Sequence, residues 1–238
     1  CPFFLMTSGG GLTTLETAIR FPIRLVESGP AGGAILASYI ARECNVENLV
    51  SFDMGGTTAK ICLIDGYEPQ STRAFEVARV YRNLRGSGLP VRIPAIEMVE
   101  IGAGGGSIAH IDAMGRINVG PESAGAEPGP ACYDQGGNFP TVTDADVILG
   151  RIDPDRFAGG RVKMAPDRAY EAIRKGIGTA TNMTDSLSAF GISEIVDENM
   201  ASAARVHAIE WGKDISARAM IAFGGAAPLH ASRLAEKL

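Results

Sequence analysis

A strand, a tight turn and a second strand are encoded by Leu49-Val50-Ser51-Phe52-Asp53-Met54-Gly55-Gly56-Thr57-Thr58-Ala59-Lys60-Ile61-Cys62-Leu63-Ile64. An apolar run ends at Asp53, two glycines and two threonines follow, and the chain then resumes as a second apolar run. Short apolar runs on either side of a glycine turn predict two paired strands. We therefore expect a β-hairpin from about residue 48 to about residue 65.

The turn of this predicted hairpin has the composition of a phosphate-binding loop. Gly55 and Gly56 carry no Cβ, so their backbone N–H groups can approach an anion, and the hydroxyls of Thr57 and Thr58 can donate to phosphate oxygens. Asp53 can hold Mg²⁺ directly or through water, because this ion prefers one or two carboxylates together with phosphate and waters. An ordinary hairpin with a Gly-Gly turn is the alternative, and the turn alone does not decide between them.

A second glycine turn lies near the end of the sequence, in Ile221-Ala222-Phe223-Gly224-Gly225-Ala226-Ala227-Pro228-Leu229-His230. The pattern predicts a buried strand over 219–223 and a helix over 228–238. The flat backbone of Gly224 and Gly225 can press against an adenine or a ribose, whereas a tight turn without a ligand is the alternative. To face one nucleotide, the two glycine turns would have to lie side by side.

The remaining elements alternate between strand and helix. Apolar residues at spacings of three and four predict helices over 30–43, 167–178 and 192–212, and Ser28 is expected to cap the first. Candidate strands lie at 3–6, 72–81, 97–101, 107–111 and 116–119. Alternating strands and helices predict an α/β fold with a β-rich middle.

The stretch from Gly120 to Thr141 is predicted to be a long ordered loop, because it holds four prolines and several glycines. Long loops inside a compact domain are often functional. Glu122, Glu127 and Cys132 could approach a substrate from this loop. A cysteine nucleophile would need a lowered pKa and a nearby base, which the sequence does not place.

Asp144 and Asp146 follow the loop and precede an apolar run. They fit the cap and first turn of a helix, where the dipole favours negative charge. An active-site carboxylate near a cleft is the alternative.

The three histidines differ in their surroundings. His207 lies on the apolar stripe of its predicted helix and is expected in the core, and His110 is expected at the surface. His230 follows the second glycine turn and is a candidate site residue. No two histidines have the spacing of a metal site.

The composition is that of a globular protein, with 45% hydrophobic and 21% charged residues among 238. The net charge of -5 is spread along the chain without a basic block, which disfavours a nucleic-acid or membrane-surface role. No apolar run reaches the roughly 18 residues of a membrane span, and no signal peptide is visible, so a cytoplasmic location is expected. Cys1, Cys44, Cys62 and Cys132 form no C-x-x-C pair and are predicted to be reduced, with Cys44 and Cys62 in packing roles.

Six motifs in this order resemble the hydantoinase A / 5-oxoprolinase family and span nearly the whole chain. They are Ser28-Gly29-Pro30-Ala31-Gly32-Gly33, Phe52-Asp53-Met54-Gly55-Gly56-Thr57, Gly102-Ala103-Gly104-Gly105-Gly106-Ser107-Ile108-Ala109, the run from Gly120 to Tyr133, Thr141-Val142-Thr143-Asp144-Ala145-Asp146, and the closing Gly-Gly-Ala-Ala-Pro-Leu-His-Ala. The chain starts at Cys1 inside an apolar run, so we expect a fragment of the central domain.

The resemblance implies the ribonuclease H-like ATPase fold of the actin, sugar-kinase and Hsp70 group, in which two related α/β halves close on a nucleotide. This chain would be the second half, with a core of 1–65 and 141–238 and a β-rich insertion over 66–140. The hairpin at Asp53 is similar in position to the second phosphate loop, and the Gly224-Gly225 turn to the adenosine-side loop.

Four residues within these motifs are candidates for a substrate cleft. They are Gly104, Gly105, Asp144 and His230. One departure from the family lies after the Gly-Gly-Thr, where a carboxylate is usual and this chain has Thr58-Ala59-Lys60. Lys60 either contacts phosphate or points to solvent.

The activity that the resemblance implies is the opening of a cyclic amide, such as a hydantoin or 5-oxoproline, driven by ATP and Mg²⁺ through a phosphorylated intermediate. ATP-dependent carboxylation of a ketone is the alternative within the family, and a non-catalytic nucleotide-binding protein is the alternative outside it. The implied partners are a hydantoinase B-like subunit or domain and the N-terminal half of the same chain. The fragment is expected to be inactive alone.

Overall fold

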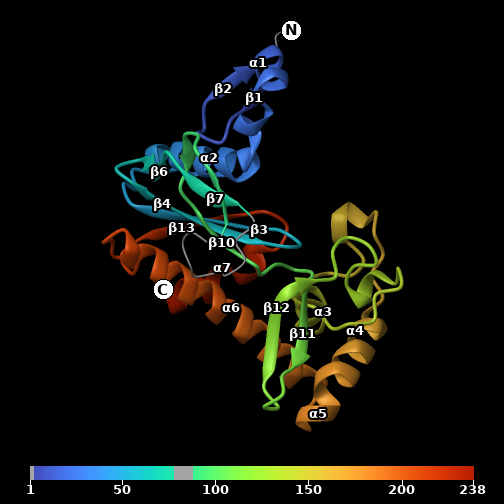
Figure 1. Cartoon of the computed structure of the whole chain (residues 1–238). Helices are drawn as coiled ribbons and strands as arrows, with labels where there is room; N and C mark the ends of the chain where they lie inside the picture. The colour runs from blue at the N-terminus through green and yellow to red at the C-terminus, as the bar shows by residue number, and fades with distance from the viewer. Residues whose placement is uncertain (1–2, 78–87) are drawn as a thin grey trace. The chain divides into compact units, whose positions relative to one another are not determined.

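The computed structural model describes residues 3–77 and 88–238, so Cys1 and the end of the strand predicted at 72–81 lie outside the described residues. The chain divides into two compact units (Figure 1). The first unit contains residues 1–53, 60–99 and 214–221, and the second contains 54–59, 100–213 and 222–238.

In the first unit, a small hairpin is followed by the helix that carries the first family motif. The hairpin pairs β1 (Phe4–Met6) with β2 (Leu12–Thr14), and α1 (Leu15–Arg20) and a 3-10 turn (Pro22–Leu25) lead to α2 (Ser28–Glu43). The predicted helix is confirmed, but Ser28 is not its cap. The cap is Glu27, which has a φ of 63° and makes no side-chain cap hydrogen bond.

A five-stranded sheet has the order β10-β4-β3-β13, with β5 paired to the outer part of β4. Its strands are β3 (Leu49–Met54), β4 (Ala59–Asp65), β5 (Glu68–Pro69), β10 (Val99–Ile101) and β13 (Ala219–Phe223). The predicted hairpin is confirmed as β3 and β4. Their apolar runs are almost wholly buried, as expected for central strands covered on both faces.

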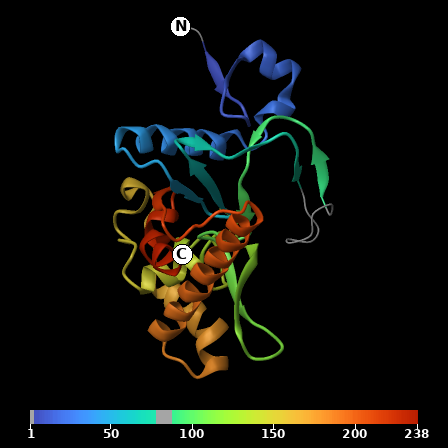
Figure 2. The ribbon, with the colours of Figure 1, turned by 90° about the vertical axis from the view of Figure 1, so that its left-hand side faces the viewer.

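Two short strand pairs also belong to the first unit. They are β6 (Ser71–Thr72) with β9 (Ala95–Ile96), and β7 (Phe75–Val77) with β8 (Leu89–Val91). Within this unit α2 contacts β1, β5 and β9 (Figure 2). Its contact face consists of small residues, with Ala31, Ala34, Ala37 and Ala41 fully buried.

The second unit is built around one long helix, α6 (Asp185–Glu210), which begins seven residues before the predicted start because Thr184 caps it. The other elements are β11 (Ser107–Ile111), β12 (Ile117–Ser123), α3 (Val142–Ile148), α4 (Pro166–Ile173), α5 (Thr179–Thr181) and α7 (Ala227–Lys237). Within the unit α6 contacts α3, α4, α7 and β12 (Figures 1 and 2). The predicted helix over 167–178 continues past α4 as a π-helical segment, Arg174–Gly178.

The loop predicted over 120–141 contains the last residues of β12 and a 3-10 turn, Ala131–Tyr133. Cys44, Cys62 and Cys132 are free, as predicted, but Cys44 is exposed at the end of α2 and does not pack in the core. Among the described residues, no helix is long and apolar enough to cross a membrane.

Candidate functional site

The turn between β3 and β4 belongs to the second unit and presents an open backbone surface. Gly55 N donates to Thr58 O at 3.1 Å, which closes the turn. Gly56 and Thr57 are exposed. An added Cβ at Gly55 or Gly56 would meet no atom within 4 Å. The turn therefore leaves room for a ligand to reach its backbone.

The opposite side of this turn rests on the glycine-rich segment 104–106. Gly105 N donates to Gly55 O at 3.0 Å, and Gly106 N donates to Gly56 O at 2.7 Å. A Cβ at Gly104 would lie 2.6 Å from the Gly56 carbonyl carbon, so only glycine fits there. The structure thus places Gly104 and Gly105 against the turn, as a backbone support.

Replacing Gly104 by alanine is expected to destabilise the protein by about 1–3 kcal/mol, the usual cost of forcing extra atoms into a tight contact. The new Cβ would strike the backbone of Gly56 and Thr57, which cannot move aside like a flexible side chain. Urea unfolding would measure the change. Gly55→Ala is the matched control, because its Cβ enters open space. Equal stability of the two variants would contradict this packing.

The second glycine turn follows β13 and lies beside the first, as predicted. Ala226 N donates to Met54 O at 2.9 Å, and this bond joins the residues that flank the two turns. Gly224 has a φ of 96°, which favours glycine, and a Cβ at Gly225 would meet no atom within 4 Å. Both turns are therefore open toward solvent while their flanking residues are hydrogen-bonded.

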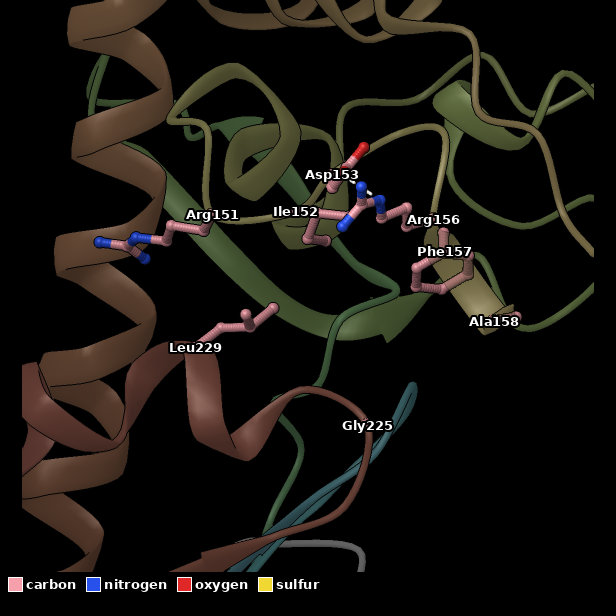
Figure 3. Close-up of a pocket in the computed structure, with 8 residues that line it drawn as sticks. All are labelled: Arg151, Ile152, Asp153, Arg156, Phe157, Ala158, Gly225 and Leu229. Carbon is pink, nitrogen blue, oxygen red and sulfur yellow. Dashed lines mark ion pairs between the residues drawn. The ribbon is translucent and has the colours of Figure 1, made fainter. Parts of the chain in front are cut away.

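A pocket of about 240 Å³ adjoins the second turn (Figure 3). It is lined by Arg151, Ile152, Asp153, Arg156, Phe157, Ala158, Gly225 and Leu229. One wall therefore comes from the segment 151–158 and the other from the turn and start of α7. The Phe157 ring is 5.7 Å from the Tyr133 ring, centre to centre, and packs on a small core that includes Cys132.

Asp144 is fully buried and anchors the loop that precedes it. Its carboxylate accepts from the backbone N–H groups of Ala131 at 3.2 Å and Cys132 at 2.8 Å. It also accepts from Thr141 N at 2.9 Å and from Thr141 Oγ1 at 2.8 Å. Thr141 is the cap of α3, and the two residues form a capping box. The helix-cap interpretation therefore has a geometric basis, with Asp144 in the first turn.

Cys132 is not activated as a nucleophile. Its side chain is buried, and burial, together with the Asp144 carboxylate, raises the pKa of the thiol. A thiol with a raised pKa stays protonated and reacts poorly. Glu122 and Glu127, from the same loop, are exposed.

His230 lies in a group of polar side chains that we call the His230 cluster, made of His230, Asp146, Arg151, Ser193 and Asp197. All are buried except Arg151, which is partly exposed. The His230 ring approaches Asp197 Oδ1 at 2.7 Å through Nδ1 and Asp146 Oδ2 at 3.2 Å through Nε2. Arg151 Nη1 donates to Asp146 Oδ1 at 3.0 Å and to Ser193 Oγ at 2.7 Å, and Ser193 Oγ donates to Asp197 Oδ2 at 3.4 Å. The cluster is a closed ring of contacts from α3, α6, α7 and Arg151.

Sequence reasoning missed three members of this cluster, namely Arg151, Ser193 and Asp197. For Asp197 the sequence did contain a signal. It follows Val196, which lies on the core-facing stripe of α6, and a carboxylate buried there needs a charged or hydrogen-bonding partner. His207 is buried and His110 is exposed, as predicted. No group of three or more His, Cys, Asp or Glu side chains that could hold a metal occurs among the described residues.

Asp53 lies at the end of β3 in the first unit and directly precedes Met54 and the glycine turn. Burial raises the pKa of its carboxyl, and the positive charge of Lys60 partly offsets this rise. Lys60 also forms an ion pair with Glu27 at 3.1 Å, so it does not simply point to solvent.

Comparisons with known proteins agree across sequence and structure. The family model described as Hydantoinase/oxoprolinase matches residues 1–238. The acetophenone carboxylase gamma subunit of Aromatoleum aromaticum is 38% identical over 234 residues, which cover 97% of this chain and 30% of that protein. The crystal structure of ATP-dependent caprolactamase from Pseudomonas jessenii has a TM-score of 0.81 and 35% identity, covering 100% of this chain and 33% of that chain.

The nucleotide-free structure of acetone carboxylase, from work on ATP-dependent acetone carboxylation, has a TM-score of 0.83 and 27% identity. It covers 98% of this chain and 32% of that chain. The present chain spans about a third of the length of the curated relatives it matches. With a family model matched over its full length, the chain belongs to the hydantoinase/oxoprolinase family.

Proposed function

We propose that this chain forms part of the ATP site of an enzyme that opens a cyclic amide of the hydantoin or 5-oxoproline type through a phosphorylated intermediate. The observation that supports it is the pair of open glycine turns, whose flanking residues Met54 and Ala226 are joined by a hydrogen bond. Open glycine backbone suits phosphate oxygens, which accept from several N–H groups at once.

The pocket beside Gly225 fits a part of the nucleotide. Its volume of about 240 Å³ is below the roughly 300–1,000 Å³ of pockets that enclose a whole ligand. A base with its ribose would fill it, while the phosphates extend toward Gly55 and Gly56. Phe157 offers a ring for stacking, and the exposed guanidinium of Arg156 offers a cation.

The residues fit Mg²⁺ only together with phosphate. Asp53 is the carboxylate proposed to hold the ion, directly or through water, since the described residues contain no three-carboxylate or histidine site. Mg²⁺ commonly binds one or two carboxylates and takes its other ligands from phosphates and water. When bound, ATP and Mg²⁺ would supply a phosphoryl group for the amide oxygen and charge neutralisation, which would make the amide carbon a better electrophile for water.

The tasks of this chain are then to bind and orient. The backbone N–H group of Gly56 and the hydroxyls of Thr57 and Thr58 would hold the phosphates, and the Gly224-Gly225 turn would hold the adenosine. Gly55 would shape the phosphate loop, because its N–H donates to Thr58 O and closes the turn. We also propose the two-halved ATPase fold, with a core of 1–65 and 141–238 and an insertion over 66–140. The N-terminal half and a hydantoinase B-like subunit or domain would complete the enzyme, which matches the share of its relatives that the chain covers.

A carboxylase is the second candidate, because two similar proteins are carboxylases that act on acetophenone and acetone. The same phosphate chemistry would then serve a ketone and bicarbonate. A turnover screen of the complete enzyme with ATP separates the two, with hydantoins, 5-oxoproline and caprolactam on one side and ketones plus bicarbonate on the other. ATP hydrolysis that depends on neither class of substrate would reject both enzymatic proposals.

Replacing Gly225 by valine is expected to weaken nucleotide binding by at least about tenfold, which corresponds to about 1.4 kcal/mol. The added side chain enters space that the structure leaves empty, so it should block a ligand and leave the fold intact. Calorimetric titration with a non-hydrolysable ATP analogue would measure the affinity, and a melting curve would check the fold.

Gly11→Val is the matched control for this substitution. Gly11 is exposed in the first unit, and a Cβ there makes only an ordinary contact with Thr7, at 3.7 Å. Its nucleotide affinity should equal that of the unmodified protein. Wild-type affinity in Gly225→Val would remove the second turn from the proposed site.

A further inference from the structure

The two walls of the pocket are connected through the His230 cluster. One wall is the segment 151–158. Arg151 links this segment to Asp146, because its Nη1 donates to Asp146 Oδ1 at 3.0 Å. The other wall includes Leu229, whose neighbour in the sequence is His230. His230 Nε2 lies 3.2 Å from the same Asp146 carboxylate. Asp146 therefore contacts Arg151 of one wall and His230, the residue that follows Leu229 of the other wall.

The cluster is also tied to α6, which supplies Ser193 and Asp197. Asp197 Oδ1 lies 2.7 Å from His230 Nδ1, and Ser193 Oγ accepts a hydrogen bond from Arg151 Nη1 at 2.7 Å. Figure 3 shows the Arg151 side chain directed away from Arg156 and Phe157. The aliphatic part of the Arg151 side chain thus lines the pocket, and its guanidinium belongs to the His230 cluster.

We propose that His230 is a positioning residue that holds the two walls of this pocket together, so that tight binding of a ligand in the pocket requires His230 to be doubly protonated. The inference rests on the proposed function, because an adenine nucleotide is the ligand used to measure it. His230 itself does not line the pocket, and its effect passes through Asp146 and Arg151 on one side and the start of α7 on the other.

The geometry demands the charged form of the imidazole. A neutral ring has one N–H donor and one acceptor, whereas both ring nitrogens of His230 face carboxylates. A neutral ring would therefore place a lone pair against one of the carboxylates. With the imidazolium and Arg151, the two carboxylates are balanced, as buried charges must be.

The direction of the pKa shift of His230 agrees with a doubly protonated ring. Burial alone would lower the pKa of His230, but its hydrogen bonds to Asp146 and Asp197 outweigh this and raise the pKa to about 9. Because the pKa is raised above that of the unfolded chain, the stabilising effect is complete below about pH 6.5 and is lost as the pH rises through about 9.

The ion-paired groups Glu194, Glu198, Arg233 and Lys237 have pKa values shifted away from this window. On the outer faces of α6 and α7, Arg233 pairs with Glu194, and Lys237 pairs with Glu194 and Glu198. Hydrogen bonds from Arg233 and Lys237 lower the pKa of Glu194 to about 2, and the bond to Glu194 raises that of Lys237. These ion pairs therefore do not account for a transition near pH 9.

The test measures the affinity of the complete protein for a non-hydrolysable ATP analogue from about pH 7 to about pH 10. We expect affinity to fall about tenfold, within the roughly 5- to 150-fold range of typical couplings between sites, with a midpoint near 9. Asp197→Asn removes one carboxylate and should move the midpoint to lower pH. His230→Gln should bind weakly at every pH. His207→Gln, which changes a buried histidine outside the cluster, should keep the wild-type profile.

A second readout does not depend on the ligand. Hydrogen exchange at residues 151–158 and 225–229 should speed up together, either above the midpoint or in His230→Gln. A pH-independent affinity, or exchange that changes at neither segment, would overturn the inference even where Gly225→Val confirms the nucleotide site. Absence of nucleotide binding by the unmodified protein would instead overturn the proposed function, and hydrogen exchange would still decide the role of His230. If His230→Gln does not fold, the pH profiles of the unmodified protein and of Asp197→Asn decide.

Discussion

Replacing Asp144 by alanine is expected to destabilise the protein by about 3–5 kcal/mol, because several buried donors lose their acceptor at once and each costs roughly 1–3 kcal/mol. The donors are the N–H groups of Ala131, Cys132 and Thr141 and the Thr141 hydroxyl, and no part of the carboxylate reaches solvent. Loss of the carboxylate also removes half of the capping box of α3. Urea unfolding of the purified variant would measure the change.

Asp214→Ala is the matched control. Asp214 also accepts from a backbone N–H and a hydroxyl, both of Ser216, but it is exposed, so water can replace it. Its effect should stay within about 1 kcal/mol. This pair of variants also separates the two interpretations of Asp144. A stable Asp144→Ala protein without turnover would identify an active-site carboxylate, whereas an unstable variant with normal turnover when folded would identify an anchor of the loop.

Local patterns were enough to predict the elements on which the site depends. The hairpin of β3 and β4, the strand β13 and the helix α7 each follow from apolar runs that end at glycine pairs. Side-by-side placement of the two turns followed from assuming a common ligand. The structure realises it through the bond from Ala226 N to Met54 O, between residues far apart in the sequence.

Contacts between distant segments were beyond the sequence. The role of segment 104–106 as a support depends on a backbone approach that no local pattern encodes. The His230 cluster joins α3, α6 and α7, and its members are ordinary polar residues when each is seen alone. The cap of α2 was misjudged because Ser28 is a good cap by type, whereas the chain turns one residue earlier, at Glu27.

The ionised carboxylate of Asp53 lowers the stability of the folded protein, which a structural role of Asp53 does not explain. Its pKa is raised by burial, against the effect of Lys60. In the absence of a metal, a raised carboxyl pKa means that the charged form disfavours folding at neutral pH. This cost declines as the pH falls through the raised pKa and is gone below the pKa of the unfolded chain. Lys60 has Glu27 as another partner. Removing the charge of Asp53 should therefore do little harm to the fold.

Asp53→Asn is expected to lower ATP turnover of the complete enzyme by roughly two to three decades, the equivalent of several kcal/mol of charge stabilisation in the transition state. Its melting temperature should equal or slightly exceed that of the unmodified protein. Both are measured on one preparation, with turnover followed at saturating Mg²⁺.

Asp65→Asn is the matched control, because Asp65 ends β4, the other strand of the same hairpin, and forms an ion pair with Arg218. Arg218 is largely buried and also donates to Ile64 O at 3.0 Å, so losing its carboxylate partner should lower the melting temperature and leave turnover of the folded enzyme nearly normal. Asp53→Asn should thus lower turnover without lowering stability, and Asp65→Asn should lower stability without lowering turnover. If Asp53→Asn instead melts early and turns over normally, Asp53 is a structural residue, and the Mg²⁺ must be held elsewhere.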